Sequence, residues 1–268
     1  MNEKVVIITG ASSGIGEALA MAYAQEGVRL VLAARNIAKL KEIGSMLSDK
    51  GIETLLVRTD VSIEEECKLL IAKTIERFGK IDILINNAGI SMRALFKDVK
   101  LEVVHRLMDV NFWGAVYMTK YALPYLLESK GSIVGVSSIA GFKGLPGRTG
   151  YSASKFALQG FLEVLRIENL KTGLHVMIAA PGFTASNIRN TALAADGSQQ
   201  GESPRDENKM MSSDEVAQHI IKAIHKRKKM LILSSQGKLT VWLNKFFPFW
   251  LDKMVYNHMA KEDDSPIS

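Results

Sequence analysis

The chain contains a single cysteine, Cys67, so it cannot form an internal disulfide bond. A chain without disulfides fits a reducing compartment, and Cys67 lies in a charged, helix-like segment where we expect an inert thiol. No stretch approaches the ~20 consecutive apolar residues that a membrane-spanning helix requires. The first apolar run, residues 5–8, is also too short for the core of a secretion signal. These absences predict a soluble, cytoplasmic protein.

The composition excludes a disordered chain, because 47% of the 268 residues are hydrophobic and 23% are charged. No internal repeat is visible, and the sequence predicts no metal site. Part of the net charge of +6 comes from the run His225-Lys226-Arg227-Lys228-Lys229. Such a run is typical of a solvated helix end, and it is accompanied by no recognition motif. We therefore expect no nucleic acid partner.

Short apolar segments alternate with longer amphipathic ones along the chain. This alternation predicts an α/β fold with a doubly wound parallel sheet of about seven strands and helices on both faces, the Rossmann-type architecture. The expected strands cover residues 4–9, 29–34, 53–59, 81–86, 132–137, 174–180 and 230–233. The expected helices cover residues 14–26, 37–50, 63–78, 101–128, 151–171 and 213–225.

Two segments interrupt the alternation and define the expected domain organisation. Residues 1–235 are expected to form a single catalytic domain, in which the small, polar segment 184–212 is a substrate loop or lid. Residues 236–268 form an amphipathic C-terminal extension that ends in an acidic tail, Glu262-Asp263-Asp264.

The first predicted strand runs directly into a glycine-rich turn, Gly10-Ala11-Ser12-Ser13-Gly14-Ile15-Gly16. Glycine allows a tight turn and lets the backbone approach a pyrophosphate, which the N-terminus of the next helix can stabilise. The spacing differs from the common Gly-x-Gly-x-x-Gly fingerprint, and a purely structural turn is the alternative. The position at a strand-to-helix junction favours dinucleotide binding.

The second predicted strand ends in Ala33-Ala34-Arg35. An acidic residue at this point would bond the 2′-hydroxyl of an adenosine ribose and repel a 2′-phosphate. Arg35 instead offers a planar cation that suits a phosphate. The sequence therefore favours NADP(H) over NAD(H), the alternative being a solvated arginine.

Tyr151 is the one tyrosine of six that has a lysine, Lys155, four residues on. Both side chains then project from one face of a helix. The alternative is a solvent-exposed pair without a catalytic role. Lowering the pKa of a phenol from about 10 to near 7 requires ~4 kcal/mol, and one cation near 4 Å supplies ~4 kcal/mol at an effective dielectric of about 20. We therefore expect Lys155 to lower the pKa of Tyr151. Ser138, at the end of a predicted strand, is expected in the same pocket.

Taken together and in order, these motifs resemble the short-chain dehydrogenase/reductase family, in its compact single-domain branch. The resemblance covers about residues 4–235 and rests on Thr9-Gly10-x3-Gly14-Ile15-Gly16, Asn86-Asn87-Ala88-Gly89, Asn111, Ser138, Tyr151-x3-Lys155 and Pro181-Gly182.

The resemblance implies a catalytic set of four residues. Ser138 would polarise the substrate carbonyl and Tyr151 would exchange the proton. Lys155 would hold the nicotinamide ribose, while Asn111 would bend its helix and position a water that links Lys155 to solvent. The implied cofactor-binding residues are Gly10, Ser12, Ser13, Gly14, Ile15, Gly16, Arg35, Asp60, Val61, Asn87, Ala88, Gly89, Tyr151, Lys155, Pro181, Gly182, Phe183 and Thr184. Taken singly, Asp60 could be a helix cap and Asn111 a polar helix residue.

The function predicted from this set is an NADP(H)-dependent oxidoreductase. It would move a hydride between nicotinamide C4 and a carbonyl or secondary alcohol, with Tyr151 as general acid and base. The alternatives are an NADPH-binding regulatory protein without turnover and a nicotinamide-dependent epimerase or dehydratase.

The substrate pocket is expected to be largely apolar, which favours a hydrophobic ketone or alcohol. No arginine pair marks an anionic substrate, although Arg93 and Arg148 could contribute. The expected substrate residues are Ser138, Met92, Phe142 and Phe183, and further candidates for the lining are Ser91, Phe96, Ile139 and Leu145.

The C-terminal extension has apolar residues at helical spacing on both sides of Pro248. A flap over the substrate cleft or a contact with another subunit is the favoured interpretation, and a homodimer or homotetramer is expected. The alternative is a weak contact with a membrane surface, which the nearby lysines would favour.

Overall fold

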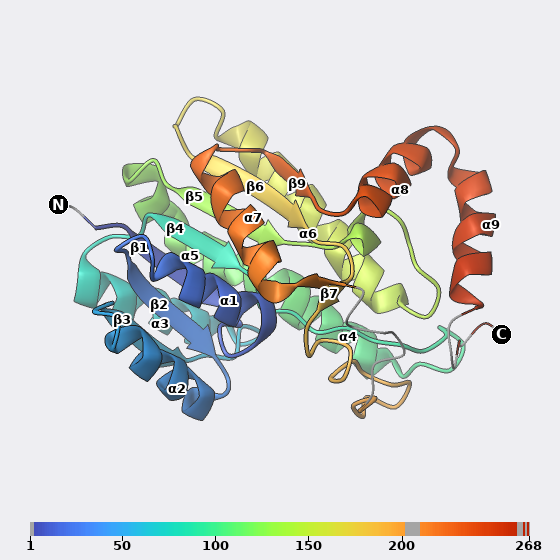
Figure 1. Ribbon diagram of the computed structural model, residues 1–268, viewed down its shortest axis with the longest axis horizontal. Helices are drawn as coiled ribbons and strands as arrows, with labels where there is room; N and C mark the ends of the chain where they lie inside the picture. Colours follow the sequence, from blue (N-terminus) through green and yellow to red (C-terminus); the bar gives the residue numbers. More distant parts are fainter. Residues whose placement is uncertain (1–2, 202–209, 262–264, 266, 268) are drawn as a thin grey trace.

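The computed structural model describes residues 3–201, 210–261, 265 and 267. Its centre is a seven-stranded parallel sheet with the strand order β3-β2-β1-β4-β5-β6-β9 (Figure 1). The strands are β1 (Val5–Thr9), β2 (Arg29–Ala34), β3 (Thr54–Arg58), β4 (Ile83–Asn86), β5 (Ser132–Val136), β6 (His175–Ala180) and β9 (Met230–Ile232). The doubly wound sheet predicted from the sequence is confirmed.

Helices cover both faces of the sheet. Along β1, Val6 and Ile8 pack in one cluster with α1 (Gly14–Tyr23), α2 (Ile37–Ser48) and α7 (Ser213–His225). The alternate residues Val5 and Ile7 pack in a second cluster. Its helices are α3 (Glu64–Phe78), α5 (Gly114–Glu128) and α6 (Thr149–Glu168). Because every residue of β1 is buried, its strand sequence is continuously apolar rather than alternating.

The strand order reverses direction at β1. The chain builds outward from β1 through β2 to β3, and then returns to place β4 on the other side of β1. In sheets of this kind, ligands bind beyond the carboxyl ends of the strands at such a switch point. The turn after β1 and the segment after β4 therefore define the expected position of the site.

The segment predicted as one helix over residues 101–128 is divided in three. It consists of α4 (Leu101–Met108), a π-helical segment η1 (Asp109–Trp113) and α5. A π-helical turn inserts an extra residue and shifts the face that the helix presents, and such turns often occur at functional sites. Asn111, predicted to bend its helix, lies within η1.

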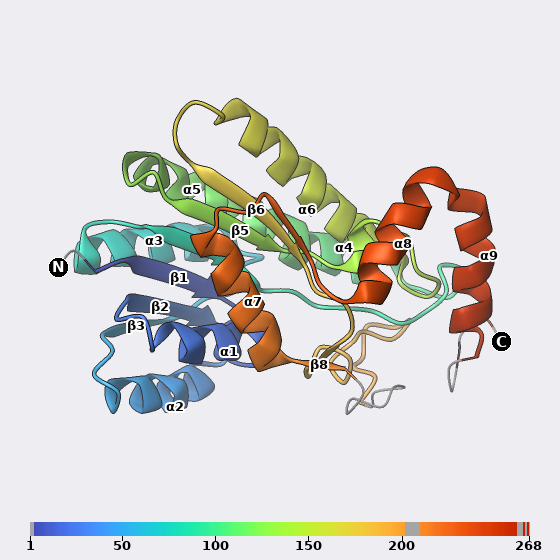
Figure 2. The same cartoon turned by 45° about the horizontal axis from the view of Figure 1, so that its top comes forward.

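The chain after the sheet forms two helices, α8 (Ser235–Phe246) and α9 (Pro248–Met259), which stand apart from the layers around the sheet (Figure 2). Pro248 starts α9, a position where a missing N–H removes no helical hydrogen bond. In the described part of the chain, no helix is long and apolar enough to cross a membrane. The acidic tail at residues 262–264 lies outside the described residues.

The segment predicted as a substrate loop, residues 184–212, contributes two short paired strands. These are β7 (Thr184–Ala185) and β8 (Met211–Ser212). Residues 202–209 of this segment lie outside the described residues.

Candidate active site

The glycine-rich turn connects β1 to α1 through tight backbone contacts. Gly10 and Gly14 have φ angles of 65° and 56°, a region that glycine adopts without steric cost. A Cβ atom on Gly16 would lie 2.2 Å from the main-chain oxygen of Gly10, so only glycine lets α1 start so close to the turn. The turn is thereby held open at the N-terminus of α1, where an anionic group can be stabilised.

Asn87 joins this turn to the segment that follows β4. Its side-chain amide donates hydrogen bonds to the main-chain oxygens of Thr9 and Gly10, at 2.9 and 3.3 Å. The Thr9 hydroxyl in turn accepts hydrogen bonds from the main-chain N–H groups of Asn87 and Ala88. The two loops at the switch point are therefore one rigid unit.

Arg35 and Asp60 lie at the end of the pocket beyond β2 and β3. Arg35 is exposed, and its guanidinium forms no hydrogen bond or ion pair with any described residue. The carboxylate of Asp60 accepts hydrogen bonds from the main-chain N–H and the hydroxyl of Ser62. Asp60 thus bonds within the turn before α3, whose N-cap is Ile63, so it does not cap that helix as the alternative held. Asp60 also lines the pocket.

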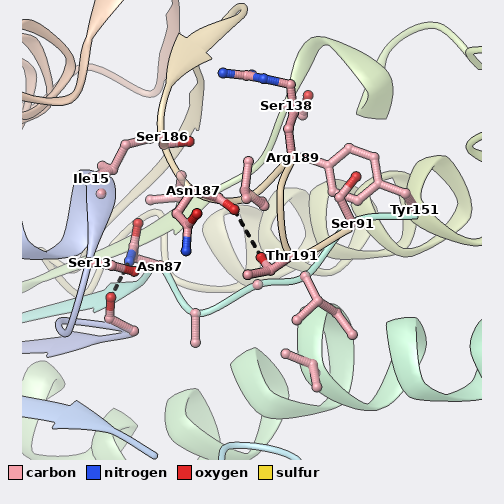
Figure 3. Close-up of a pocket in the computed structure, with 18 of the residues that line it drawn as sticks. Ser13, Ile15, Asn87, Ser91, Ser138, Tyr151, Ser186, Asn187, Arg189 and Thr191 are labelled. Atoms are coloured by element: carbon pink, nitrogen blue, oxygen red, sulfur yellow. Dashed lines mark hydrogen bonds between the residues drawn. The ribbon is translucent and has the colours of Figure 1, made fainter. Parts of the chain in front are cut away.

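Ser138, Tyr151 and Lys155 meet at the other end. Ser138 follows β5, and its hydroxyl accepts a hydrogen bond from the Ala140 N–H at the start of a short 3-10 helix, η2 (Ile139–Gly141). Tyr151 and Lys155 both project from the first turns of α6 and are buried. Tyr151 is hydrogen-bonded to Ser138. Figure 3 shows Ser138 and Tyr151 on one side of the pocket, with Ser13 and Asn87 on the opposite side.

The electrostatics of Tyr151 correct the expectation from the sequence. Burial raises the pKa of Tyr151, and the Ser138 hydrogen bond and the charges of Arg148 and Arg189 offset only part of that rise. The Nζ atom of Lys155 lies 5.8 Å from the centre of the Tyr151 ring. Burial also lowers the pKa of Lys155 to about 8, so its charged form is less favoured than in water. Before any ligand binds, Lys155 does not lower the pKa of Tyr151 toward 7.

Asn111 holds the segment after β4 against α6. Its Oδ1 atom accepts a hydrogen bond of 2.8 Å from the Ile90 N–H, and its Nδ2 atom donates to the Ile90 oxygen and to the Ser154 hydroxyl. The amide is therefore fully used in buried contacts. Asn111 does not line the pocket, and its position fits a structural support close to Lys155.

These groups surround one pocket of about 410 Å³. Of the residues predicted to bind cofactor, those that line it are Gly10, Ser12, Ser13, Gly14, Ile15, Arg35, Asp60, Val61, Asn87, Ala88, Gly89, Tyr151, Lys155, Pro181, Gly182, Phe183 and Thr184. Gly16 is the exception, because it packs beneath the turn.

Only some of the predicted substrate residues line the pocket. Ser138 and Phe183 line it, as do Ser91 and Leu145. Met92 and Phe142 do not line it. Met92 is fully buried behind the lining, in an apolar cluster that also contains Tyr151 and Leu193. Among the further candidates, Phe96 is 61% exposed and Ile139 packs near Gly237, so neither lines the pocket.

Two arginines lie at the end of the pocket that holds Tyr151. Arg148 and Arg189 both line the pocket, and both charges act on Tyr151. Arg189 also donates a hydrogen bond of 2.7 Å to the main-chain oxygen of Thr184. Arg148, named from the sequence as a possible contributor, is the N-cap residue of α6, three residues before Tyr151. Arg189 lies in an irregular segment, where the sequence gives no comparable signal.

Known proteins resemble this chain in both sequence and structure. The family model described as short chain dehydrogenase matches residues 4–196. The 11-beta-hydroxysteroid dehydrogenase A of Sesamum indicum is 36% identical over 263 residues, which cover 94% of this chain and 75% of that protein. The dehydrogenase/reductase SDR family member 7B of Mus musculus is 34% identical over 274 residues, with 100% and 85% covered.

Two solved structures have the same fold. A short-chain dehydrogenase/reductase from Burkholderia phymatum in complex with NAD is 26% identical, with a TM-score of 0.82 over 91% of this chain and 93% of that one. An alcohol dehydrogenase from the archaeon Thermococcus sibiricus, complexed with 5-hydroxy-NADP, is 27% identical, with a TM-score of 0.76 over 86% and 96%. The sequence match, the strand order and the conjunction of the glycine turn with Ser138, Tyr151 and Lys155 agree: the chain belongs to the short-chain dehydrogenase/reductase family.

Proposed function

We propose that this protein is an NADP(H)-dependent oxidoreductase that interconverts a carbonyl compound and its secondary alcohol. The observation that carries the proposal is the placement of Ser138, Tyr151 and Lys155 at one end of a pocket whose other end holds the glycine turn and Arg35. One pocket thus combines a proton donor with a cradle for a dinucleotide.

The residues present fit a nicotinamide dinucleotide. The turn after β1 presents its backbone and the start of α1 to the pocket, as a pyrophosphate requires. Gly10, Ser12 and Ile15 would hold the pyrophosphate, and Asp60 and Val61 would border the adenine. The segment from Pro181 to Thr184 would hold the nicotinamide end. The structures from Burkholderia phymatum and Thermococcus sibiricus, which contain NAD and 5-hydroxy-NADP, support this assignment.

Arg35 supports NADP(H) as the preferred form. It is exposed at the carboxyl end of β2 and lines the pocket, and it is engaged by no described acidic residue. A planar guanidinium binds the 2′-phosphate of NADP(H) well, whereas NAD(H) offers it only a hydroxyl group.

A nicotinamide held by these residues would supply or accept the hydride. The chain itself moves the proton: Tyr151, whose pKa is raised by burial, keeps its proton at neutral pH and can donate it to a carbonyl oxygen. Ser138, hydrogen-bonded to Tyr151, would bind the same oxygen and stabilise its developing negative charge. The protonated state of Tyr151 suits carbonyl reduction. Alcohol oxidation instead needs the phenolate, which higher pH and the nearby arginines favour.

The experiment that tests the proposal measures NADPH consumption with a panel of ketones, in the wild type and in Tyr151→Phe. We expect steady consumption of one NADPH per ketone reduced, and a loss of kcat of ~10²–10⁴-fold in the variant. The dissociation constant for NADPH, measured by fluorescence, should not change. An NADPH complex without turnover would support a regulatory protein, and product formation without net NADPH consumption would support an epimerase or dehydratase.

A further inference from the structure

A partly buried arginine adjoins the end of the pocket where Tyr151 lies. Arg148 directly precedes α6, three residues before Tyr151, and both line the pocket. The Nη1 atom of Arg148 donates a hydrogen bond of 2.7 Å to the Ser91 hydroxyl. Figure 3 shows Ser91 beside Tyr151. The positive charge of Arg148 is therefore close to the proposed proton donor, which the effect of Arg148 on Tyr151 also shows.

No described acidic side chain neutralises this arginine. Burial lowers the pKa of Arg148, and the charges of Arg93 and Arg189 lower it further. Among the described residues that line the pocket, the acidic one is Asp60, which lies beyond β3 at the opposite end. Arg148 is partly withdrawn from water without an opposite charge beside it, and an anionic group brought by a ligand would compensate for that lost solvation.

The lining of the pocket also contains apolar side chains among its polar ones. Leu145, Phe183, Ile188 and Leu193 all line the pocket. Apolar side chains of this kind can bind an aliphatic or aromatic chain, but they offer no opposite charge to the guanidinium of Arg148. The two features together describe a ligand with an acidic group and an apolar remainder.

We propose that Arg148 binds an acidic group of the substrate, a carboxylate or a phosphate, while the substrate carbonyl lies at Ser138 and Tyr151. This proposal rests on the proposed function, and it names the substrate class as an anionic ketone or the corresponding hydroxy acid with an apolar chain. The guanidinium suits this task because its planar N–H groups match carboxylate and phosphate oxygens. Nη1 is bonded to Ser91, so the other N–H groups would meet the anion.

The test compares matched charged and uncharged ketones. The carboxylate pair is 5-oxodecanoate and its methyl ester, and the phosphate pair is 4-oxononyl phosphate and 4-oxononanol. The wild type should show a higher kcat/KM for at least one anion than for its uncharged partner. The pair with the larger ratio identifies the acidic group, and ratios near one for both pairs would overturn the proposal.

The variant Arg148→Gln separates anion binding from an effect on Tyr151. A lost charge-assisted hydrogen bond is worth ~1.5–3 kcal/mol, so the ratio of kcat/KM for anion over uncharged ketone should fall ~10–100-fold. Arg148→Lys should restore part of that ratio. If Arg148 only adjusts the pKa of Tyr151, both ketones lose activity equally and the pH profile shifts, which would refute the anion site.

A control and a binding measurement keep this test independent of the proposed function. Arg166→Gln removes a cation from the same helix that forms only a surface pair with Glu163, and it should leave both ratios unchanged. If no ketone consumes NADPH, the oxidoreductase proposal fails. The role of Arg148 is then decided by calorimetry, which measures binding of the same anions and their uncharged partners to the NADP⁺ complex. If an anion binds more tightly than its uncharged partner and Arg148→Gln removes that difference, the anion site is supported. If anion and uncharged partner bind equally to the wild type, the anion site is overturned.

Discussion

The Nζ atom of Lys155 donates a hydrogen bond of 2.9 Å to the main-chain oxygen of Val136, near the carboxyl end of β5. Both residues are buried, and burial lowers the pKa of Lys155 from 10.5 to about 8. An amine that prefers its charged form in an unfolded chain is thus held where that form is disfavoured. The burial of Lys155, which we propose holds the nicotinamide ribose, therefore destabilises the fold at neutral pH.

We expect Lys155→Met to abolish turnover and yet to raise the free energy of unfolding at pH 7. The shift of the Lys155 pKa from 10.5 to about 8 corresponds to a gain in the free energy of unfolding of at most ~3 kcal/mol when the amine is removed. The loss of the hydrogen bond to Val136 reduces this gain. Between pH 8 and 10.5, Lys155 is protonated in the unfolded chain but has lost its proton in the folded one. The free energy of unfolding of the wild type therefore rises with pH through this range. The advantage of the variant should be complete below pH 8 and should shrink above it. Urea denaturation at pH 7, 9 and 10 measures this, and a variant less stable than the wild type at pH 7 contradicts it.

Arg35→Asp should change the cofactor preference from NADP(H) toward NAD(H). The substitution removes the cation that would bind the 2′-phosphate and introduces a carboxylate that repels it and can bond a 2′-hydroxyl. We expect KM for NADPH to rise ~10–100-fold while KM for NADH falls. Arg77→Gln is the matched control. Arg77 is an exposed arginine on α3 that pairs with Glu53 and does not line the pocket. Unchanged constants for both cofactors in Arg35→Asp would remove Arg35 from the cofactor site.

The fold could be predicted from the sequence because its signals are local. Continuous apolar segments mark strands buried on both faces, and all seven expected strands lie in the sheet. The glycine turn and the Tyr151–Lys155 spacing likewise place their residues through contacts within one or two elements. The division of residues 101–128 by a π-helical segment was not predicted, because the main cause visible in the structure is a tertiary hydrogen-bond set around Asn111.

The electrostatics of the site could not be predicted from the sequence. The spacing of Tyr151 and Lys155 shows that they share a helix face, but it does not show how deeply either is buried. Burial decides the direction of both pKa shifts. Arg189 reaches the site from an irregular segment that follows β7, and its position depends on packing rather than on periodicity. The substrate pocket was therefore expected to be more apolar than it is.

Asn111→Ala should destabilise the protein by about 2–4 kcal/mol. The substitution leaves the main-chain N–H and oxygen of Ile90 without the amide that binds both, in a largely buried site where each unsatisfied group costs ~1–3 kcal/mol. Thermal or chemical denaturation measures the loss. Asn257→Ala, an exposed asparagine on α9, serves as the control and should change stability by less than about 0.5 kcal/mol. An Asn111→Ala protein as stable as this control would mean that the amide does not support the segment after β4.

The helices α8 and α9 expose an unusual number of aromatic side chains, which predicts that they contact another surface. Phe249 is 84% exposed and Trp242, Phe246, Phe247 and Trp250 are each more than half exposed. Described residues of α8 and α9 do not line the pocket. The flap over the substrate cleft expected from the sequence stays a prediction. Asp252 pairs with Lys143, while Lys238, Lys245 and Lys253 remain exposed among the aromatic residues.

A second copy of the chain and an anionic membrane surface are the two contacts expected from the sequence, and one pair of experiments separates them. Sedimentation of the full chain should reveal a homodimer or homotetramer, and flotation with vesicles containing phosphatidylserine should reveal lipid binding. The double variant Phe249→Ser, Trp250→Ser should lose the contact that is found, while its free energy of unfolding changes by less than about 1 kcal/mol because both side chains are largely exposed. If the wild type is monomeric and does not float with vesicles, these aromatic residues serve neither contact. If the double variant forms the same oligomer or binds vesicles as the wild type does, the contact lies on another face.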